Sequence, residues 1–493
     1  MVHIKPVLCA ACGAVLSYYC LFPMYRSGII SITGLLALAF IPVVFLSLLR
    51  VLDSFPILIY WTTAFAVGLV IGIGAGANAS DPVRFGLPEE TIQGISGTLL
   101  DDPRVISGNR AMSTLSLRMA MGTGGTRATS SGQITVFFRE ENVQRLKEFG
   151  RGTEVFAEGY LRRSDTDSGF NSLGAYTFSA DALHITKTAP SLERFRTGLR
   201  LGLTGRFLDS HGSWAGLALA LLLGIRDNLD TGFSALYRDA GCSYILALSG
   251  MHLAVLVSII SFLLKKPLGL RPAAIAGAVI IAAYCFIVGP LPSLNRAAIM
   301  YLVGVTAVLG MLKRDMLPLL CTAFLIQLIF VPASGFSLSF ILSYLALAGI
   351  LVIGKAINGA FLGKIPACLL QPLSASLGAF LATAGVSAWF FNDLRPVGIL
   401  AGLVLAPLAT VFMVLSIAWL GLDLITPALS FLPGKILSLL YRLMEKTAAL
   451  SAAVPGIKAN PFLIILLSLL MIAAILWLDR RRRLIAGRLE PFA

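Results

Sequence analysis

The stretch GCSYILALSGMHL, residues 241–253, decides how this chain is to be read. It places Ser249, Gly250 and His252 at the head of an apolar run that continues to Leu264. A polar atom buried in such a run loses its water and must find another partner. Polar residues at this point of an apolar segment therefore indicate a packed, irregular or water-lined place, which makes the segment the first candidate for a functional site.

The composition is that of a membrane protein. Hydrophobic residues make up 57% of the 493 residues and charged residues only 13%, whereas soluble domains carry about 25% charged residues. Much of the excess positive charge behind the net charge of +14 lies at the ends of apolar runs. The residues at these ends are Lys265, Lys266, Lys313, Arg314 and Arg480 to Arg483. This is the distribution that the positive-inside rule describes, so the basic charge alone does not indicate nucleic-acid binding.

The apolar runs predict a polytopic α-helical membrane protein with about 10–12 spans, because a span needs about 20 apolar residues. The predicted spans are 6–22, 28–49, 55–76, 244–264, 271–289, 296–312, 315–332, 336–353, 371–391, 396–421 and 461–478. The segment 430–453 is a weaker, amphipathic candidate, and 214–224 is apolar but too short to span. Six of the seven cysteines lie in apolar runs, where small buried residues are the ordinary explanation.

Residues 77–188 are different in character and predict a β domain. Runs of alternating polarity at 113–119, 132–138 and 154–161 read as strands, with turn residues between them. Five or so short strands in this length are typical of an OB-like barrel. The segment holds 12 Arg and Lys against 13 Asp and Glu, so a purely structural barrel stays open beside a DNA-binding one. The candidates for DNA contacts are Arg110, Arg118, Arg127 and Arg139.

These patterns divide the chain into five parts. We expect three N-terminal transmembrane helices at 1–76, the β domain at 77–188, an amphipathic interfacial helix at 189–212, a transmembrane channel domain at 213–478 and a basic cytoplasmic tail at 479–493. In the helix, Leu192, Phe195, Leu199, Leu203 and Phe207 form the apolar stripe, and Arg194, Arg196, Arg200 and Arg206 lie off it. Placing the basic loops inside puts residues 77–188 outside the cytoplasmic membrane.

Four constellations interrupt the apolar runs of the channel domain. They are 221–226 with 237–253, 289–300, 335–340 with 349–350, and 405–408. Broken helices at membrane depth are tolerated where they line a cavity or are buried in protein. The pore or core candidates are Gly224, Arg226, Gly241, Ser249, Gly250, His252, Ser293, Arg296, Ser337, Ser339, Phe340 and Pro407.

The polar members of this set predict a cluster. We expect His252, Arg296 and the pair Ser337 and Ser339 to approach one another, because each needs a partner in an apolar surrounding. Simpler explanations stay open: Arg296 can snorkel, the serines can bond back to their own helix, and His252 can be a packed histidine with satisfied polar atoms.

Catalysis is not predicted. The four histidines, His3, His184, His211 and His252, have no metal-ligand spacing, and no phosphate-binding loop of the G-x-x-x-x-G-K-[ST] type occurs. Ser249 and His252 lack a neighbouring carboxylate, which weakens them as a nucleophile and base. We therefore expect no enzyme activity, no metal site and no cofactor.

In this order, the four constellations resemble the ComEC-type competence family of inner-membrane DNA channels. The family pattern runs LLLGDR, F-R-x-x-G, H-L-L-A-I-S-G-L-H, G-x-x-P-S-x-x-R-A-x-x-M, G-F-x-L-S-F-x-A-x-x-G-I and N-L-L-A-x-P, and it matches from about 213 to 410. Three positions depart from it: Ile225, Tyr244 and Gly402 replace the aspartate, the first histidine and the asparagine. The resemblance implies passage of single-stranded DNA across the cytoplasmic membrane during natural competence.

The resemblance also implies partners. Many members of the family carry a C-terminal metallo-β-lactamase-like domain, whereas this sequence shows no H-x-H-x-D-H motif. We expect a separate nuclease, a DNA receptor, a cytoplasmic motor protein and contact with membrane lipid, and the protein is a candidate homo-oligomer. Two alternatives stay open: a small-solute or lipid-linked-metabolite transporter on the same fold, and a degenerate member that transports nothing.

Overall fold

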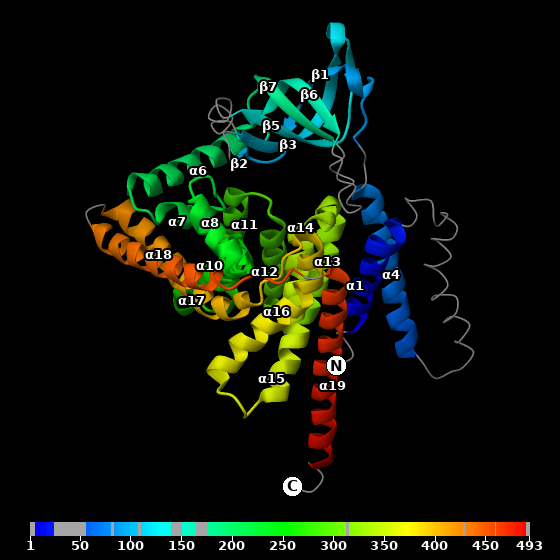
Figure 1. The fold of residues 1–493 in the computed structure, drawn as a ribbon, viewed down its shortest axis with the longest axis vertical. Helices are drawn as coiled ribbons and strands as arrows, with labels where there is room; N and C mark the ends of the chain where they lie inside the picture. Colours follow the sequence, from blue (N-terminus) through cyan, green and yellow to red (C-terminus); the bar gives the residue numbers. More distant parts are fainter. Residues whose placement is uncertain are drawn as a thin grey trace.

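The computed structural model describes residues 5–23, 56–79, 83–106, 110–139, 150–163, 176–311, 315–426, 429–458 and 460–489. A β domain stands at one end of the molecule and the helices fill the rest (Figure 1). The predicted span 28–49 lies outside the described residues.

Seven described helices are long and apolar enough to cross a membrane, which confirms a polytopic membrane protein. They are α10 (Gly250–Leu268), α11 (Leu270–Val288), α12 (Pro292–Leu309), α14 with α15 (Leu338–Gly349 and Lys355–Phe361, joined by a π-helical turn at Ile350–Gly354), α16 (Ala367–Phe391), α17 (Val397–Ile425) and α19 (Pro461–Leu489). Three other apolar helices are α1 (Lys5–Leu16), α4 (Pro56–Ala79) and α13 (Met316–Phe330).

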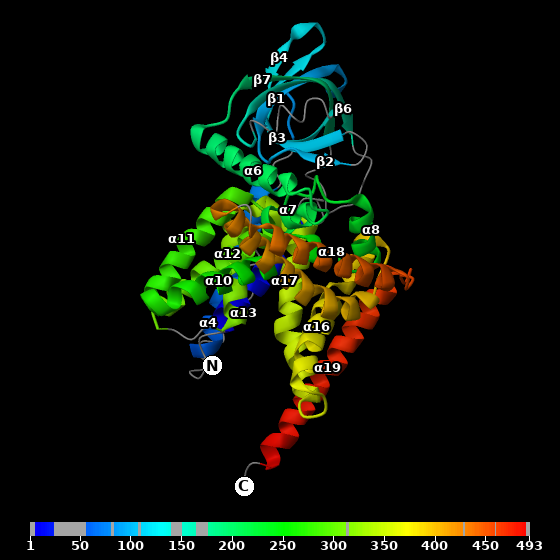
Figure 2. The same ribbon diagram turned by 90° about the vertical axis from the view of Figure 1, so that its left-hand side faces the viewer.

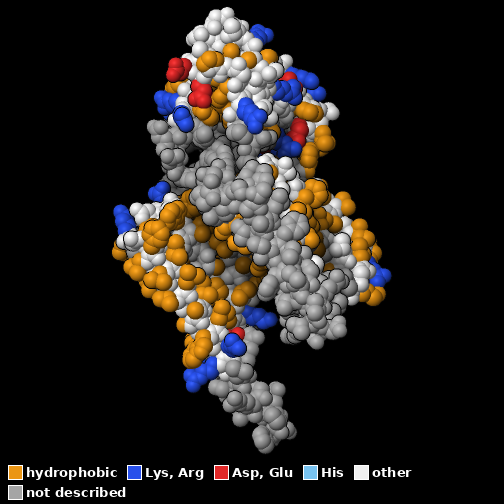
Figure 3. Space-filling model, turned by 90° about the vertical axis from the view of Figure 1, so that its right-hand side faces the viewer, with side chains coloured by type: hydrophobic (Ala, Val, Ile, Leu, Met, Phe, Trp, Pro, Cys, Tyr) orange, Lys and Arg blue, Asp and Glu red, His pale blue; other side chains and the backbone are white. Residues whose placement is uncertain are grey.

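The surface of the helical part is apolar. Figure 3 shows hydrophobic side chains covering it, while charged side chains gather over the β domain and near the opposite end. Large side chains such as Phe262, Phe330 and Leu450 are about four-fifths exposed. Such a surface is costly in water and is suited to a hydrocarbon surrounding.

The predicted span 244–264 is wrong at its start. A short helix α9 (Ser243–Leu246) is followed by an extended segment, and α10 begins only at Gly250. The backbone breaks because Ser249 is extended (φ −131°, ψ 177°) and caps α10 with its side chain. An N-cap serine satisfies an amide at the helix start that has no acceptor within the helix.

The apolar segment 214–224, which was predicted to be too short to span the membrane, is a buried helix. All nine residues of α7 (Ala215–Leu223) are buried. Around it lie α8 (Thr231–Asp239), α17 and the amphipathic α18 (Phe431–Ala452). Trp214 packs edge-on against Trp419, with ring centroids 5.1 Å apart. Among the described residues, the largest buried cluster therefore includes Cys242, Ile245 and Leu246, which begin the segment that carries the Ser-Gly-x-His sequence.

The β domain is a ring of five strands with two additional ones. The strands are β1 (Ile92–Leu99), β2 (Arg104–Ile106), β3 (Arg110–Gly122), β4 (Arg127–Thr129), β5 (Gln133–Arg139), β6 (Glu154–Arg163) and β7 (Tyr176–Lys187). The order β1-β6-β7-β5-β3 closes by pairing of β1 with β3, and only the β5–β7 pair is parallel. Figure 2 shows the resulting barrel. The predicted strands at 113–119, 132–138 and 154–161 lie within β3, β5 and β6.

Alternation along the strands builds the interior of this domain. In β3, Ala111, Leu115 and Leu117 are buried, while Arg110 and Arg118 point outward. Because successive side chains of a strand point to opposite faces, this pattern places the apolar set inside the ring.

Helix α6 (Ser191–Asp209) joins the β domain to the helices, at the place where an amphipathic helix was predicted. The exposed apolar face carries Leu192 and Phe195, whereas Phe207 at the other end of the predicted stripe is buried. Arg196, predicted on the polar face, is only 1% exposed. Its burial is possible because two carboxylates, those of Asp102 and Glu193, neutralise it.

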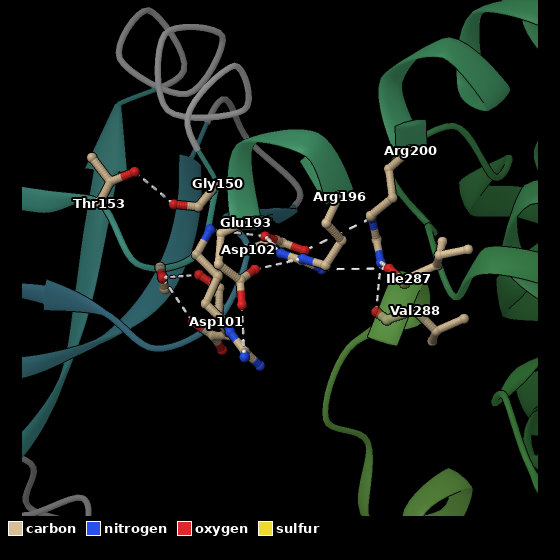
Figure 4. A network of polar contacts seen from close by, with 11 residues as sticks. Asp101, Asp102, Gly150, Thr153, Glu193, Arg196, Arg200, Ile287 and Val288 are labelled. Atoms are coloured by element: carbon tan, nitrogen blue, oxygen red, sulfur yellow. Dashed lines mark hydrogen bonds and ion pairs between the residues drawn. The ribbon is translucent and has the colours of Figure 1, made fainter. Parts of the chain in front are cut away.

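The network in Figure 4 shows how α6 holds both parts. Toward the β domain, Arg196 donates to Asp102 Oδ1 at 2.5 Å and to Glu193 Oε2 at 2.7 Å. Toward the helices, Arg200 donates to the carbonyl oxygens of Ile287 (2.9 Å) and Val288 (2.5 Å) at the end of α11. A cation at a helix C-terminus satisfies carbonyls that have no partner within the helix.

Asp102 is the carboxylate of this network that interacts with both Arg196 and Arg200. Burial by itself raises the pKa of the Asp102 carboxyl, but the hydrogen bond from Arg196 and the charges of Arg200 and Arg196 outweigh it, and the pKa lies below its ordinary value of 3.8. Because the pKa of Asp102 is lower in the folded state, its carboxylate stabilises the fold at a pH above its ordinary pKa. This stabilisation is lost as the pH falls through the folded-state pKa.

We predict that Asp102→Asn lowers the free energy of unfolding by about 2 kcal/mol, because a buried arginine loses a charged hydrogen-bond acceptor. The measurement is thermal unfolding of the purified chain in detergent. The matched control is Glu154→Gln, whose ion pair with Arg118 is solvent-exposed and contributes little. The difference between Asp102→Asn and the unmodified protein should begin to shrink as the pH falls below about 4 and should go on shrinking as the pH falls through the lowered pKa of Asp102; a difference that does not shrink on acidification would contradict this account.

Candidate functional site

The break before α10 is held by its own polar residues. Ser249 Oγ accepts from the amide of Met251 at 3.3 Å, and His252 Nδ1 accepts from the amide of Ser249 at 3.0 Å. This reciprocal capping box fixes the first turn of α10. His252 is 2% exposed, so its first role is visible in the structure: it satisfies a backbone amide that would otherwise be buried without a partner.

Two residues from distant motifs hold the carbonyl groups of the same break. Arg226 donates from Nη2 to the Leu246 carbonyl at 3.0 Å, and Ser293 Oγ donates to the Leu248 carbonyl at 2.7 Å. Arg226 follows α7, and Ser293 lies in the first turn of α12. We call this assembly the α10–α12 junction; its members are Arg226, Leu246, Leu248, Ser249, Gly250, His252, Ser293 and Arg296.

Arg296 completes the junction. It is 7% exposed, and its Nη2 lies 3.0 Å from the point where a side chain on Gly250 would place its Cβ. The guanidinium also lies over the ring of Tyr344, 5.8 Å from the centroid. Among the residues that the structure describes, no carboxylate pairs with it, and its Nε has no hydrogen-bond partner. A buried cation with only a ring face beside it is unusual.

Sequence reasoning missed the polar residues beneath Arg296. The hydroxyl of Tyr344 on α14 donates to Gln327 Oε1 at 3.0 Å, and Gln327 Nε2 donates to the Pro292 carbonyl at 3.2 Å. Gln327 is 1% exposed within α13. A single glutamine in an apolar run was the available signal, because a buried amide needs partners on another helix.

The structure does not bring the two serines of the third constellation to the junction. Ser337 caps α14 by accepting from the Phe340 amide at 3.2 Å, and its hydroxyl donates to the Ser334 carbonyl. Ser339 is exposed. Within the described residues no hydrogen bond joins either serine to His252 or Arg296. The prediction that the two serines belong to this cluster is therefore wrong, because both lie at the start of α14.

The rest of this constellation packs against the N-terminal helices. The carbonyl of Gly335 accepts from the hydroxyl of Tyr19 at 2.7 Å. A Cβ on Gly335 would lie 2.7 Å from the hydroxyl of Tyr18. Phe340 is 1% exposed, between Phe324 and Tyr344. Gly335 and Phe340 therefore contribute close packing.

Two other candidate glycines serve the backbone, and the candidate proline lies in a long helix. Gly224 ends α7 with φ +70°, and Gly241 has φ +69°. A Cβ on Gly241 would lie 2.8 Å from the carbonyl oxygen of Arg395, just before α17. Pro407 lies within α17 with its ring exposed, where it removes one backbone hydrogen bond.

The four candidate arginines of the β domain do not form one free basic face. Arg118 pairs with Glu154 at 2.9 Å. Arg110 and Arg139 are directly opposite each other on β3 and β5, and Arg110 helps to line a small hollow with Tyr160. Arg127 lies on β4, outside the ring.

No group of three or more histidine, cysteine, aspartate or glutamate side chains capable of holding a metal ion occurs in the described part of the chain. The donors at the junction are nitrogen and hydroxyl groups without carboxylates. Their chemistry is suited to binding an anion or to holding backbone carbonyls, and not to coordinating a cation.

The junction lies within the region that matches a known family. A model of the family described as Competence protein matches residues 221–482, which is more than half of the chain. The chain belongs to this family. The match begins in α7 and includes every member of the α10–α12 junction. Some of the residues that carried the resemblance are thus those that hold the break before α10, among them Arg226, Ser249, His252 and Ser293.

Two relatives are similar over parts of the sequence. An uncharacterized protein of Aquifex aeolicus is 28% identical over 323 residues, which cover 63% of this chain and 73% of that protein. ComE operon protein 3 of Bacillus subtilis is 24% identical over 222 residues, 44% of this chain and 27% of that protein. The match therefore spans about a quarter of the second relative's length. No solved structure matches.

We predict that Gly241→Ala destabilises the protein, by about 1–2 kcal/mol for the positive φ alone and by more through the contact with Arg395. Gly304→Ala is the matched control. It lies in α12, has no atom within 4 Å of the added Cβ, and should be neutral or stabilising by up to about 1 kcal/mol. Thermal unfolding in detergent measures both; equal effects would show that the backbone at Gly241 is not constrained.

Proposed function

We propose that this chain conducts single-stranded DNA across the cytoplasmic membrane during DNA uptake. The observation that carries the proposal is the α10–α12 junction, where polar groups from three motifs of a competence family meet within an apolar helix bundle. Ionisable residues inside a membrane domain are rare and often mark the path of a transported substrate. Backbone breaks at membrane depth occur where they line a cavity or are buried in protein, and the first of these cases is the one that a transport path provides.

The side from which DNA arrives follows from the same proposal. The β domain lies at one end of the molecule, and the arginine-rich end of α19 lies at the other (Figure 1). Placing Arg480 to Arg482 in the cytoplasm agrees with the positive-inside rule. Residues 77–188 are then outside, and α6 lies along the outer membrane–water boundary with Leu192 and Phe195 toward lipid.

Transport needs other proteins in this scheme. The matched motifs provide a path and not an energy source, since the sequence carries no phosphate-binding loop. We propose a DNA receptor outside, a nuclease that yields the single strand, and a motor protein in the cytoplasm as partners. A homo-oligomer is compatible with the large exposed apolar surface of the helices.

We predict that His252→Ala and Arg296→Ala each reduce uptake of labelled DNA by about tenfold or more, the effect of losing one charged or buried hydrogen-bond donor. The measurement uses a deletion strain with the gene restored in each form. Cys12→Ser is the control, because Cys12 is exposed on α1, and should leave uptake unchanged. Uptake that equals the unmodified level, with normal amounts of both variants in the membrane, would contradict DNA transport through the junction.

The topology has its own test. We predict that a cysteine at Gly125, in an exposed turn of the β domain, reacts with a membrane-impermeant maleimide in cells whose cytoplasmic membrane is intact. A cysteine at Arg481, near the end of α19, should react only after that membrane is permeabilised. The reverse pattern would place the β domain in the cytoplasm.

A further inference from the structure

The start of α10 presents hydrogen-bond donors without acceptors. His252 Nδ1 accepts from a backbone amide, so the neutral imidazole carries its proton on Nε2. This Nε2 is buried and has no hydrogen-bond partner among the described residues. The Nε of Arg296, a second buried donor beside the same helical turn, likewise has none in that part of the chain.

Several positive charges act at or near this turn. The N-terminus of a 19-residue helix carries a partial positive charge. The charge of Arg226 acts on His252, and the charge of Arg104, in the β domain, acts on Arg226. No ion pair joins Arg296 to a carboxylate within the described residues. A protein that buries a cation normally supplies an anion for it, and here the described side chains supply none.

We propose that Arg296 and the first turn of α10 form a binding site for a phosphodiester oxyanion. The oxyanion accepts from the guanidinium of Arg296, and the partial positive charge at the N-terminus of α10 adds to the attraction. The site itself rests on these contacts; that the phosphodiester belongs to single-stranded DNA rests on the proposed function.

The position of Arg296 suits such a ligand. Arg296 lies four residues after the start of α12, which is about 6 Å along the helix axis. The start of α12 directly follows the C-terminal end of α11. Arg200 of α6, beneath the β domain, holds this end of α11. Arg296 therefore lies near the end of the helices that is held to the β domain, the side from which the proposed function brings the anion.

Gly250 lets the guanidinium of Arg296 approach the start of α10. A Cβ at this position would lie 3.0 Å from Arg296 Nη2 and 3.4 Å from the Cβ of Ala297. Because Gly250 has an ordinary helical position without a positive φ, its lack of a side chain is not required by the backbone. The close approach of the guanidinium to the helix is the remaining reason for a glycine.

The test uses the full chain in phosphatidylcholine nanodiscs and a fluorescent single-stranded oligodeoxynucleotide. We expect Arg296→Gln to raise the Kd about tenfold and to reduce the slope of log Kd against log salt by about 0.7, the contribution of one phosphate contact in a single strand. Gly250→Ala keeps the charge but places a Cβ 3.0 Å from Arg296 Nη2, which displaces the guanidinium from the helix start, and should also raise the Kd. Arg481→Gln, at the far end of α19, should leave both quantities unchanged.

Stability separates a ligand site from packing. Arg296→Met should raise the melting temperature without ligand, because it removes an uncompensated buried charge, and should abolish the stabilisation that the oligonucleotide gives. Two results together would overturn the proposal. One is a lower melting temperature of Arg296→Met, and the other is an unchanged Kd and salt slope in Arg296→Gln and Gly250→Ala.

The source of the phosphodiester is resolved by a second titration. Nanodiscs that contain phosphatidylglycerol should not compete with the oligonucleotide if the ligand is DNA. If phosphatidylglycerol stabilises the unmodified protein but not Arg296→Met, and the oligonucleotide does neither, the oxyanion site stands and DNA transport through it fails. If neither probe distinguishes the unmodified protein from Arg296→Met, the site does not exist.

Discussion

The arrangement of the helical part depends on one constraint: a backbone break inside an apolar bundle must satisfy every peptide group that it frees. Between α9 and α10 the chain is extended, so its amides and carbonyls have no helical partners. Ser249 and His252 satisfy the amides, while Arg226 and Ser293 satisfy the carbonyls. The spacing of three motifs in the sequence follows from the need to place these four side chains around one break.

The same constraint explains what the sequence could and could not predict. Apolar runs predicted most helices because length and hydropathy decide membrane insertion. They misplaced the start of α10, since Tyr244 to Leu248 are as apolar as the residues that follow, and only the capping geometry of Ser249 ends the run. Alternating polarity predicted the strands of the β domain for the equally local reason that side chains alternate along a strand.

Contacts between distant segments were less accessible to sequence reasoning. The capping role of Ser337 is local and explains why this serine does not reach the junction. Gln327 was a lone polar residue in an apolar run, and its partners Tyr344 and Pro292 lie on two other helices. Arg196 read as part of a solvated face because periodicity alone does not show that Asp102 and Glu193 approach it from one side.

The two buried arginines show how structural and functional burial differ. Arg196 is 1% exposed and has two carboxylates within 2.7 Å; the pairs offset its desolvation, and the result is a rigid joint between the β domain and α11. Arg296 is 7% exposed with an aromatic face and a glycine beside it. A buried cation that neighbouring side chains leave uncompensated is stabilised only when an anion arrives. The connection 289–291 links the α11 end of the joint to α12, so the structural arginine fixes the position at which the unpaired one meets its ligand.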